Sequence, residues 1–490
     1  MNSVSIMQEL WMVAPEIFLL SMSCIILIMD LFLSARFKMI SYTAIQISLI
    51  ITACLCWFVA NHYLPEASYV SVFSNQFMVD YFSQIIKIII LIIILFVMLY
   101  SRVYVNIRKI AMGEYQILIL FSTLGMLCLA SANSLLMIYL GLELLSLPLY
   151  TLVALNRESA LSVEAGMKYF IMGSLASGLL LYGLSLLYGL TGSLILSDIA
   201  IQIWTAQGAA LGLYLLSVVF IVVGISFKFG AVPFHMWVPD VYEGAASSVT
   251  MLISSAPKVA AFALAYRLLA DTLPDLSQVF GTFFIILALL SLAVGNIIAI
   301  AQTNLKRMLG YSTIGHVGFI LLGLATGASD GYSAVTFYVL VYALLTLGAF
   351  ATIVLLSPLH FEAENINDFK GLARRNPWIA FLMMIFMFSF AGIPPTVGFY
   401  AKFIILKSLV EINLTWVAAF AVLFSVIGAY YYLRVIKVMY FDMPDSEHEG
   451  ATLSDTPLDA RIALSINGLA ALGLGIFPAP LFYICQKMLT

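Results

Sequence analysis

Four lysines lie inside long apolar segments of this chain, at Lys87, Lys228, Lys258 and Lys402. A charged side chain at the centre of a bilayer costs about 2.5–3.5 kcal/mol on insertion scales, so a chain that keeps four must hold them in a hydrated or charge-paired interior. Burial disfavours the charged form of lysine, whereas a nearby carboxylate favours it. A lysine whose carboxylate partner moves can therefore bind and release a proton. A water-linked row of such lysines can pass protons along.

Glu143, in the apolar segment "GLELLSLPLY", is the acidic residue best placed to pair with Lys228. Lys87 is the weakest member of the series, because it follows Asp80 by seven residues and can extend its amine towards a membrane interface. The alternative interpretation is that these charges form structural ion pairs. That interpretation suits a single pair, whereas a series of four lysines at membrane depth favours proton transfer.

Two of the lysine segments are interrupted by glycine and proline. In "GISFKFGAVPFHMWVPD", Pro233 lacks an N–H group and clashes with the carbonyl four residues back, that of Phe229. The backbone hydrogen bonds just after Lys228 should therefore loosen and be replaced by waters or side chains. The segment "FSFAGIPPTVGFYAKF" has the same design ahead of Lys402. A packing kink explains either break alone, but two breaks five spans apart are typical of an inverted repeat of five helices.

Two histidines extend the series of candidates. His235 follows Lys228 by seven residues and, on a continued helix, would lie on the same face roughly 10 Å away. His316 lies mid-span in "GYSTIGHVGF". Histidine exchanges protons near neutral pH, although either residue can also be a hydrogen-bonded packing residue. Asp240 and Glu243 are expected in a loop rather than in a proton-collecting site. The predicted proton-relay residues are Glu143, Lys228, Lys258, Lys402, His316 and His235.

The composition identifies an integral membrane protein, because 63% of the 490 residues are hydrophobic and 10% are charged, compared with about half and a quarter in soluble domains. There is no basic stripe that would bind nucleic acid. The five cysteines lack the spacing of a metal or iron–sulfur site, and no nucleotide-binding glycine motif follows a strand. We therefore expect no cofactor or metal in this chain, and no removable signal segment at its start.

A window of roughly 20 apolar residues predicts an all-α polytopic membrane protein with about 14 transmembrane helices. The predicted spans are 11–34, 40–60, 78–101, 113–131, 134–155, 164–190, 211–236, 247–270, 279–302, 307–327, 332–356, 378–410, 414–438 and 459–485. Most of the 22 basic residues then fall on one side, whereas Arg267, Lys407 and Lys487 fall on the other. The positive-inside rule therefore predicts that both termini lie outside, on the side of the membrane away from the cytoplasm.

The inverted repeat divides the chain into four predicted parts. Residues 1–112 form an N-terminal three-helix segment, and residues 113–270 form the first repeat, with spans 4–8. Residues 271–440 form the second repeat, with spans 9–13, and residues 441–490 form an acidic loop and a C-terminal helix. Each repeat would build half of a path across the membrane, with broken helices at spans 7 and 12.

Five ordered segments carry a resemblance to a known family: "GLELLSLPLY", "KFGAVPFHMWVPDVYEGA", "APKVAAFALAYR", "AQTNLKRMLGYSTIGHVGF" and "AGIPPTVGFYAKF". They resemble the antiporter-like membrane subunits of respiratory complex I from about residue 110 to residue 440. The resemblance implies 14 helices in an inverted repeat, with Glu143 and Lys228 as a coupled pair. It further implies that Lys258 is the central relay and that Lys402 is the far lysine of the second half-path.

Two features favour the N type of this family, the bacterial equivalent of mitochondrial subunit 2. The M type generally has glutamate where this chain has Lys402, and the L type extends into a long lateral helix after its last spans. The resemblance also implies that NAD, FMN, iron–sulfur clusters and quinone are bound by other subunits. The expected partners are other membrane-arm subunits, including neighbouring antiporter-like subunits, and the lipid bilayer.

Two other functions are compatible with the same lysines. One is a subunit of a multisubunit cation/proton antiporter, which would share the relay but have no link to electron transfer. The other is an architectural membrane subunit whose charges only pair, in which case replacing Lys258 would leave proton pumping intact.

Overall fold

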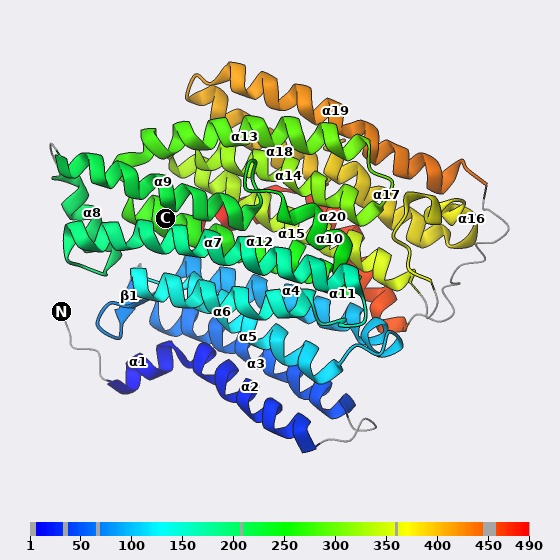
Figure 1. The fold of residues 1–490 in the computed structure, drawn as a ribbon, viewed down its shortest axis with the longest axis horizontal. Helices are drawn as coiled ribbons and strands as arrows, with labels where there is room; N and C mark the ends of the chain where they lie inside the picture. Colours follow the sequence, from blue (N-terminus) through cyan, green and yellow to red (C-terminus); the bar gives the residue numbers. More distant parts are fainter. Residues whose placement is uncertain are drawn as a thin grey trace.

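The computed structural model describes residues 6–32, 38–64, 69–205, 209–357, 361–443 and 457–489. Helices dominate these ranges and run roughly along one direction, so the molecule is a helix bundle (Figure 1). The N-terminal segment consists of α1 (Ile6–Met12), α2 (Ala14–Phe32), α3 (Lys38–Tyr63), the antiparallel strands β1 (Tyr69–Val72) and β2 (Phe77–Asp80), and α4 (Tyr81–Ile107).

The middle of the chain consists of α5 (Met112–Ala130), α6 (Leu135–Val153), α7 (Ala160–Thr191), α8 (Leu196–Trp204), α9 (Ala209–Phe229), α10 (Trp237–Gly244), α11 (Ser247–Ser254), α12 (Ala256–Tyr266) and the π-helical turn η2 (Arg267–Thr272). It is followed by η3 (Pro274–Leu276), α13 (Ser277–Ile300), α14 (Leu305–Leu324), α15 (Ser329–Leu355), η4 (Ile366–Phe369), α16 (Leu372–Arg375), α17 (Pro377–Ala391), α18 (Val397–Glu411), α19 (Thr415–Tyr440), α20 (Leu458–Ile476) and α21 (Ala479–Lys487).

The predicted fold class is confirmed. In the described ranges, 12 helices are long and apolar enough to cross a membrane. The 20-residue helix α14 and the broken pair α17–α18 lie in the same bundle, and with those 12 they account for the fourteen predicted crossings. Large apolar side chains such as Leu31 and Trp57 are exposed on the outer helices α2 and α3, as expected for helices that face lipid.

Helix α15 lies in the interior of the bundle, because it is buried along nearly its whole length. It contacts α4, α11 and α12 on one side and α14, α17 and α18 on the other. It therefore separates, and can connect, the two regions in which the buried lysines lie.

Glycines in the left-handed region end both predicted broken helices. Gly230 follows α9 with φ +81°, and Gly392 follows α17 with the same φ. Glycine is favoured at this position because it has no Cβ to clash. The structure adds a third break that the sequence analysis missed: α11 ends at Ser254 and α12 begins at Ala256, with Pro257 in its first turn.

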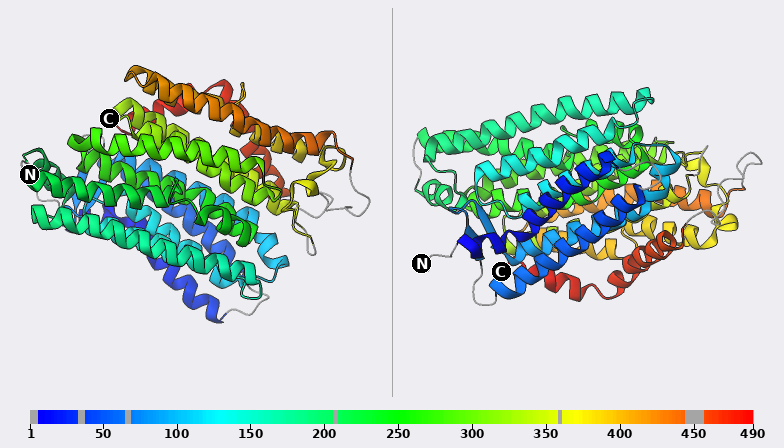
Figure 2. Two further views of the ribbon diagram at one scale, coloured as in Figure 1. Left: turned by 45° about the horizontal axis from the view of Figure 1, so that its top comes forward. Right: turned by 90° about the horizontal axis from the view of Figure 1, so that it is seen from below.

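Both chain ends lie at one end of the bundle, beside α1, β1 and α8 (Figures 1 and 2). Helices α10, α11 and α16 lie at the opposite end (Figure 1). We call these the terminal end and the opposite end. Most of the predicted acidic loop after residue 441 falls outside the described residues.

Candidate functional site

The first lysine site lies where α9 breaks. The Lys258 amine, on α12, donates hydrogen bonds to the carbonyl oxygens of Phe229 (2.7 Å) and Lys228 (3.3 Å). These carbonyls are free because the helix stops at Phe229, and they carry the negative end of the helix dipole. The ammonium also lies 5.2 Å from the ring centre of Trp237. The break therefore builds a cage of oxygens and aromatic surface around a fully buried lysine.

Lys228 itself points to α6. Its amine donates to the Ser146 hydroxyl at 2.7 Å, and that hydroxyl donates in turn to the Leu142 carbonyl. Within the described residues, Lys228 and Glu143 form no ion pair, and Glu143 Oε1 is buried without a hydrogen-bond partner. Ser146, one helical turn after Glu143, thus occupies the position next to the Lys228 amine that was predicted for the Glu143 carboxylate.

A cavity of about 20 Å³ lies between these groups and is lined by Ser146, Lys228, Trp237 and Lys258 together with apolar side chains. A cavity needs about 10–15 Å³ to hold a water molecule, and such a water needs two or more polar partners. The cavity therefore has room for about one water between Lys228 and Lys258.

The second lysine site repeats this chemistry at the break between α17 and α18. The Lys402 amine donates to the carbonyls of Phe390 (2.9 Å) and Ala391 (3.0 Å), which end α17. It also donates to the Ser425 hydroxyl on α19 (2.9 Å) and lies 5.4 Å from the ring centre of Phe319. A cavity of about 290 Å³ lies beside the amine. Both sites thus hold a lysine against the carbonyl end of a broken helix.

His316 lies between the two sites, in a cluster of aromatic and hydroxyl groups. Its Nδ1 is 2.7 Å from the Tyr338 hydroxyl and its Nε2 is 3.1 Å from the Tyr432 hydroxyl. The imidazole ring centre is 5.3 Å from that of Phe390, whose carbonyl holds Lys402. His316 lies mid-span, as predicted. Its ring contacts that of Phe390, and Phe390 belongs to the second lysine site.

Hydroxyl groups on α15 connect His316 with the first site. Thr346 donates to the Ser254 carbonyl, one turn before Lys258, and to the Tyr342 carbonyl. The Tyr342 hydroxyl donates to Thr313 on α14 at 2.7 Å, and its ring centre lies 5.3 Å from that of His316. Polar groups therefore lie at intervals between the two lysine cages, and among the described residues their hydrogen bonds do not form an unbroken chain.

Two expectations about side-chain placement were wrong. His235 does not lie on a continued helix, because α9 ends at Phe229 and a turn separates it from α10. Its Nδ1 is buried without a partner. Lys87 does not extend to an interface: it is fully buried, and its amine lies 2.5 Å from a Glu16 carboxylate oxygen. The N-terminal helix α2 supplies that acid, which apolar patterning alone gives no reason to pair with Lys87.

Ion pairs cluster at the opposite end of the bundle. Asp240, on α10 rather than in a loop, pairs with Lys168 (2.8 Å) and Arg307 (2.9 Å), and Arg307 also pairs with Glu243 (2.6 Å). Partial burial raises the pKa of Asp240, but hydrogen bonds and charge attraction from Lys168 and Arg307 outweigh it and hold the pKa below its ordinary value. Asp240 therefore stays ionised at neutral pH, and the ion pairs tie α7, α10 and α14 together.

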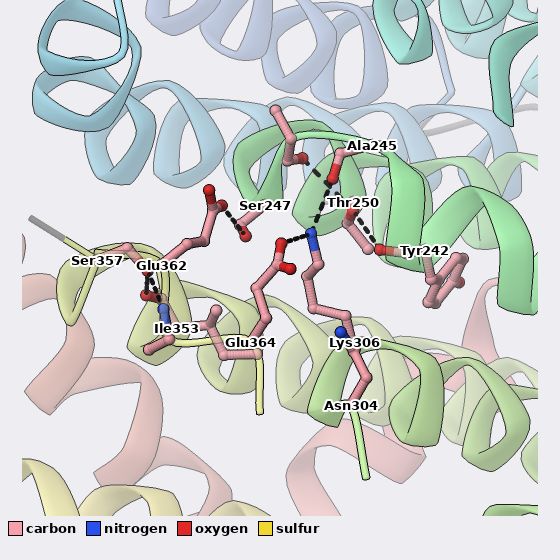
Figure 3. A network of polar contacts seen from close by, with 12 residues as sticks. Tyr242, Ala245, Ser247, Thr250, Asn304, Lys306, Ile353, Ser357, Glu362 and Glu364 are labelled. Carbon is pink, nitrogen blue, oxygen red and sulfur yellow. Dashed lines mark hydrogen bonds and ion pairs between the residues drawn. The ribbon is translucent and has the colours of Figure 1, made fainter. Parts of the chain in front are cut away.

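A polar pocket of about 550 Å³ lies next to this cluster. Its wall includes Glu362, which accepts a hydrogen bond from Ser247 (2.8 Å) at the start of α11 and contacts the Tyr104 hydroxyl. Lys306 pairs with Glu364 and donates to the Ala245 carbonyl (Figure 3). Burial raises the pKa of Glu362, but Lys306, Tyr104, Arg108 and Ser247 together hold it below its ordinary value.

Ser247 begins a polar face that leads inward from this pocket. Thr250 and Ser254 follow it at helical spacings of three and four residues along α11, and Lys258 lies in the first turn of α12, beyond the break. Ser248 on α11 and Tyr242 on α10 have buried hydroxyls without hydrogen-bond partners in the described residues. The hydroxyls of Thr250 and Ser254 donate to backbone carbonyls, so hydroxyl groups lie between the polar pocket and the first lysine cage.

Sequence reasoning missed several polar partners of the predicted residues. Ser146 and Ser425 are single hydroxyls within apolar segments, and Glu362 lies in a loop. The signal for Ser146 was present, because a serine three residues after Glu143 lies on the same helical face. No sequence signal places Ser425 or Glu362 near their partners, because Ser425 lies on the next helix after Lys402 and Glu362 contacts residues more than 100 positions away.

A polytopic helix bundle whose broken helices present their carbonyl ends to buried lysines belongs to the class of antiporter-like membrane subunits. The family described as NADH:quinone oxidoreductase/Mrp antiporter, transmembrane, matches residues 132–428. The chain belongs to this family.

Full-length relatives narrow the class further. NADH-quinone oxidoreductase subunit N from Thioalkalivibrio sulfidiphilus is 51% identical over 481 residues, which is 98% of each chain. Subunit N from Coxiella burnetii is 48% identical over 96% of each chain. The chain is also similar to a subunit of respiratory complex I from Thermus thermophilus, with a TM-score of 0.80 and 30% identity over 96% of this chain and 98% of that one.

The fold alone is shared more widely. A chain of the Mrp complex from Dietzia has a TM-score of 0.84 at 19% identity, over 99% of this chain and 97% of that one. The bundle is therefore common to relatives in different assemblies, and the function must be argued from the site and from the closer relatives.

Proposed function

We propose that this chain is a proton-translocating subunit in the membrane arm of NADH:quinone oxidoreductase. Two lysine cages, with hydroxyls and a histidine lying between them in an apolar core, carry the proposal. The identity of 51% and 48% to two subunit N sequences, over nearly the full length of each, supports the assignment to this enzyme. NAD, FMN, iron–sulfur clusters and quinone would be bound by other subunits, and neighbouring antiporter-like subunits would be partners within the bilayer.

The proposed path begins at the polar pocket of the opposite end. Glu362 and Ser247 pass protons inward along α11 to Lys258, which shares the small cavity with Lys228, and His235 provides a further group near the same break. Glu143, one helical turn before Ser146 on α6, modulates the charge on Lys228. Protons then move past the Thr346–Tyr342–Thr313 hydroxyls and His316 to Lys402. The opposite end would face the cytoplasm and the terminal end the periplasm of a bacterial inner membrane.

Energy for this movement must come from elsewhere. Moving one proton against a potential of 100 mV needs roughly 2.3 kcal/mol. The proposed relay only binds and passes protons. Electron transfer in partner subunits supplies the energy, and displacement of charge near Glu143 and Lys228 transmits it to the relay.

The alternative is a subunit of a multisubunit cation/proton antiporter, and the shared fold with the Mrp complex favours keeping it as the second candidate. An antiporter subunit would drive proton movement from a cation gradient and would not depend on NADH. Proton movement that continues without NADH but requires a sodium gradient would support this alternative.

The direct test compares wild type with Lys228→Ala in inverted membrane vesicles at equal assembly. We expect NADH-driven quinone reduction and vesicle acidification both to fall about tenfold or more, because removing a positioned proton-transfer group typically costs 10²–10⁴-fold. Lys437→Ala serves as the matched control, since this lysine is 65% exposed and pairs with Asp442 at the end of α19. Unchanged activities in Lys228→Ala would show that the lysine is structural.

A second variant tests the polar pocket. Glu362→Gln keeps the side-chain size but removes the charged acceptor of Ser247. We expect proton pumping to slow by a factor of about 2 to 10, as expected from loss of a hydrogen bond worth roughly 0.5–1.5 kcal/mol. Initial acidification rates in the same vesicles measure the effect. Glu364→Gln is the control, because Glu364 pairs with Lys306; equal slowing in both variants would contradict a specific role for Glu362.

A further inference from the structure

Arg267 is a buried charge that the proposed relay does not use. It follows α12 at the terminal end of the bundle, and 1% of its side chain is exposed. Its guanidinium donates to Asp80 (2.8 Å), to Asp271 (3.1 Å) and to the Ala130 carbonyl (3.0 Å), and lies 5.0 Å from the Phe82 ring centre. One side chain thus ties together the ends of α4, α5 and α12.

Arg267 lies close to the first lysine cage. The cavity that Lys228 and Lys258 share is also lined by Leu129 and Leu264. Leu129 directly precedes Ala130, whose carbonyl Arg267 binds, and Leu264 lies one helical turn before Arg267. The guanidinium therefore occupies the next layer of the bundle on the terminal side of the cavity.

The chemistry of arginine differs from that of the relay lysines. A guanidinium stays protonated in proteins and has donors but no acceptor, so it cannot accept a proton from a neighbouring water or lysine. Its donors here already bind the acceptors that a water chain would need. A fixed arginine is also a known electrostatic barrier to protons in membrane pores.

We propose that Arg267, held by Asp80 and Asp271, is the proton seal of the first half-path at the terminal end. It stops a proton on Lys258 from leaving directly at that end, so the proton continues towards His316 and Lys402. This inference rests on the proposed proton relay and gives the relay its direction.

The test measures proton leak in inverted vesicles that contain the assembled complex. Arg267→Gln combined with Asp80→Asn removes the guanidinium without leaving Asp80 unpaired. We expect quinone reduction to continue while NADH-driven acidification falls severalfold, and a preformed pH gradient to decay severalfold faster without NADH. A decay rate equal to wild type in the assembled double variant overturns the proposal.

Two further variants separate a specific leak from general damage. Glu16→Gln with Lys87→Met removes another buried ion pair, one that does not line the cavity, and should keep the wild-type decay rate. Adding Lys258→Met to the Arg267 and Asp80 changes should abolish the leak. A leak that persists without Lys258, or an equal leak in the control pair, overturns the seal.

Arg267→Lys covers the case in which the neutral variant does not assemble. It keeps the charge and most of the packing, but a lysine can release its proton. We expect a measurable leak, whereas wild-type decay would show that a permanently protonated group is not required. If Lys258→Met alone leaves pumping intact, the proposed relay fails, and that result is distinct from failure of the seal.

Discussion

Lys258→Met should lower both NADH-driven proton translocation and quinone reduction to below about a tenth of wild type, since loss of a positioned proton carrier costs roughly 10²–10⁴-fold. Lys258 is the buried cation that binds the free carbonyls of the broken α9 and shares a cavity with Lys228. Methionine fills a similar space but carries no proton. Vesicle acidification and quinone reduction, measured together, give the result.

Both activities should fall together, because the energy of electron transfer is released only as protons move. Lys437→Met, which alters an exposed lysine, is the control for expression and assembly. Lys258→Met also leaves the Phe229 carbonyl without its buried hydrogen-bond donor, which lowers stability by about 1–3 kcal/mol. Assembly of this variant must therefore be measured. Full pumping in the assembled variant would support an architectural role for the lysine instead.

Lys402→Met should have an effect of the same size, for a parallel reason. Its amine binds the two carbonyls that end α17 and the Ser425 hydroxyl, and within the described residues no carboxylate pairs with it. These three groups accept hydrogen bonds from the protonated amine, so they stabilise its charge without a carboxylate partner. We expect acidification and quinone reduction below about a tenth of wild type in the same vesicles.

Lys407 provides the matched control for Lys402. It lies five residues later on the same helix, is 63% exposed and pairs with Glu411. Lys407→Met should therefore retain wild-type pumping and electron transfer. Equal losses in the two variants would mean that α18 is generally sensitive to substitution, and the assignment of Lys402 to the relay would be wrong.

The sequence predicted the features that depend on local backbone chemistry. Pro233 pointed to a disturbed carbonyl at Phe229, and that carbonyl is the one that Lys258 binds. The Gly and Pro residues ahead of Lys402 predicted the second break in the same way. The number of helices followed from apolar length, because the bilayer fixes how many residues a crossing needs.

The features that sequence reasoning missed depend on contacts between distant helices. Lys87 pairs with Glu16 across α2 and α4, and no spacing rule links positions 71 residues apart. His235 was misplaced because the helix was assumed to continue beyond its break. The boundaries of the two inverted repeats and the roles of the relay residues remain predictions.

The most direct measurement is the rate of proton translocation and of NADH oxidation by the intact complex in proteoliposomes, comparing wild type with Lys258→Met combined with Lys402→Met. The account predicts that both rates fall together to the level of the single variants or below, with normal assembly. Wild-type rates and an unchanged number of protons per NADH in the double variant would contradict the claim that this chain carries protons along its buried lysines.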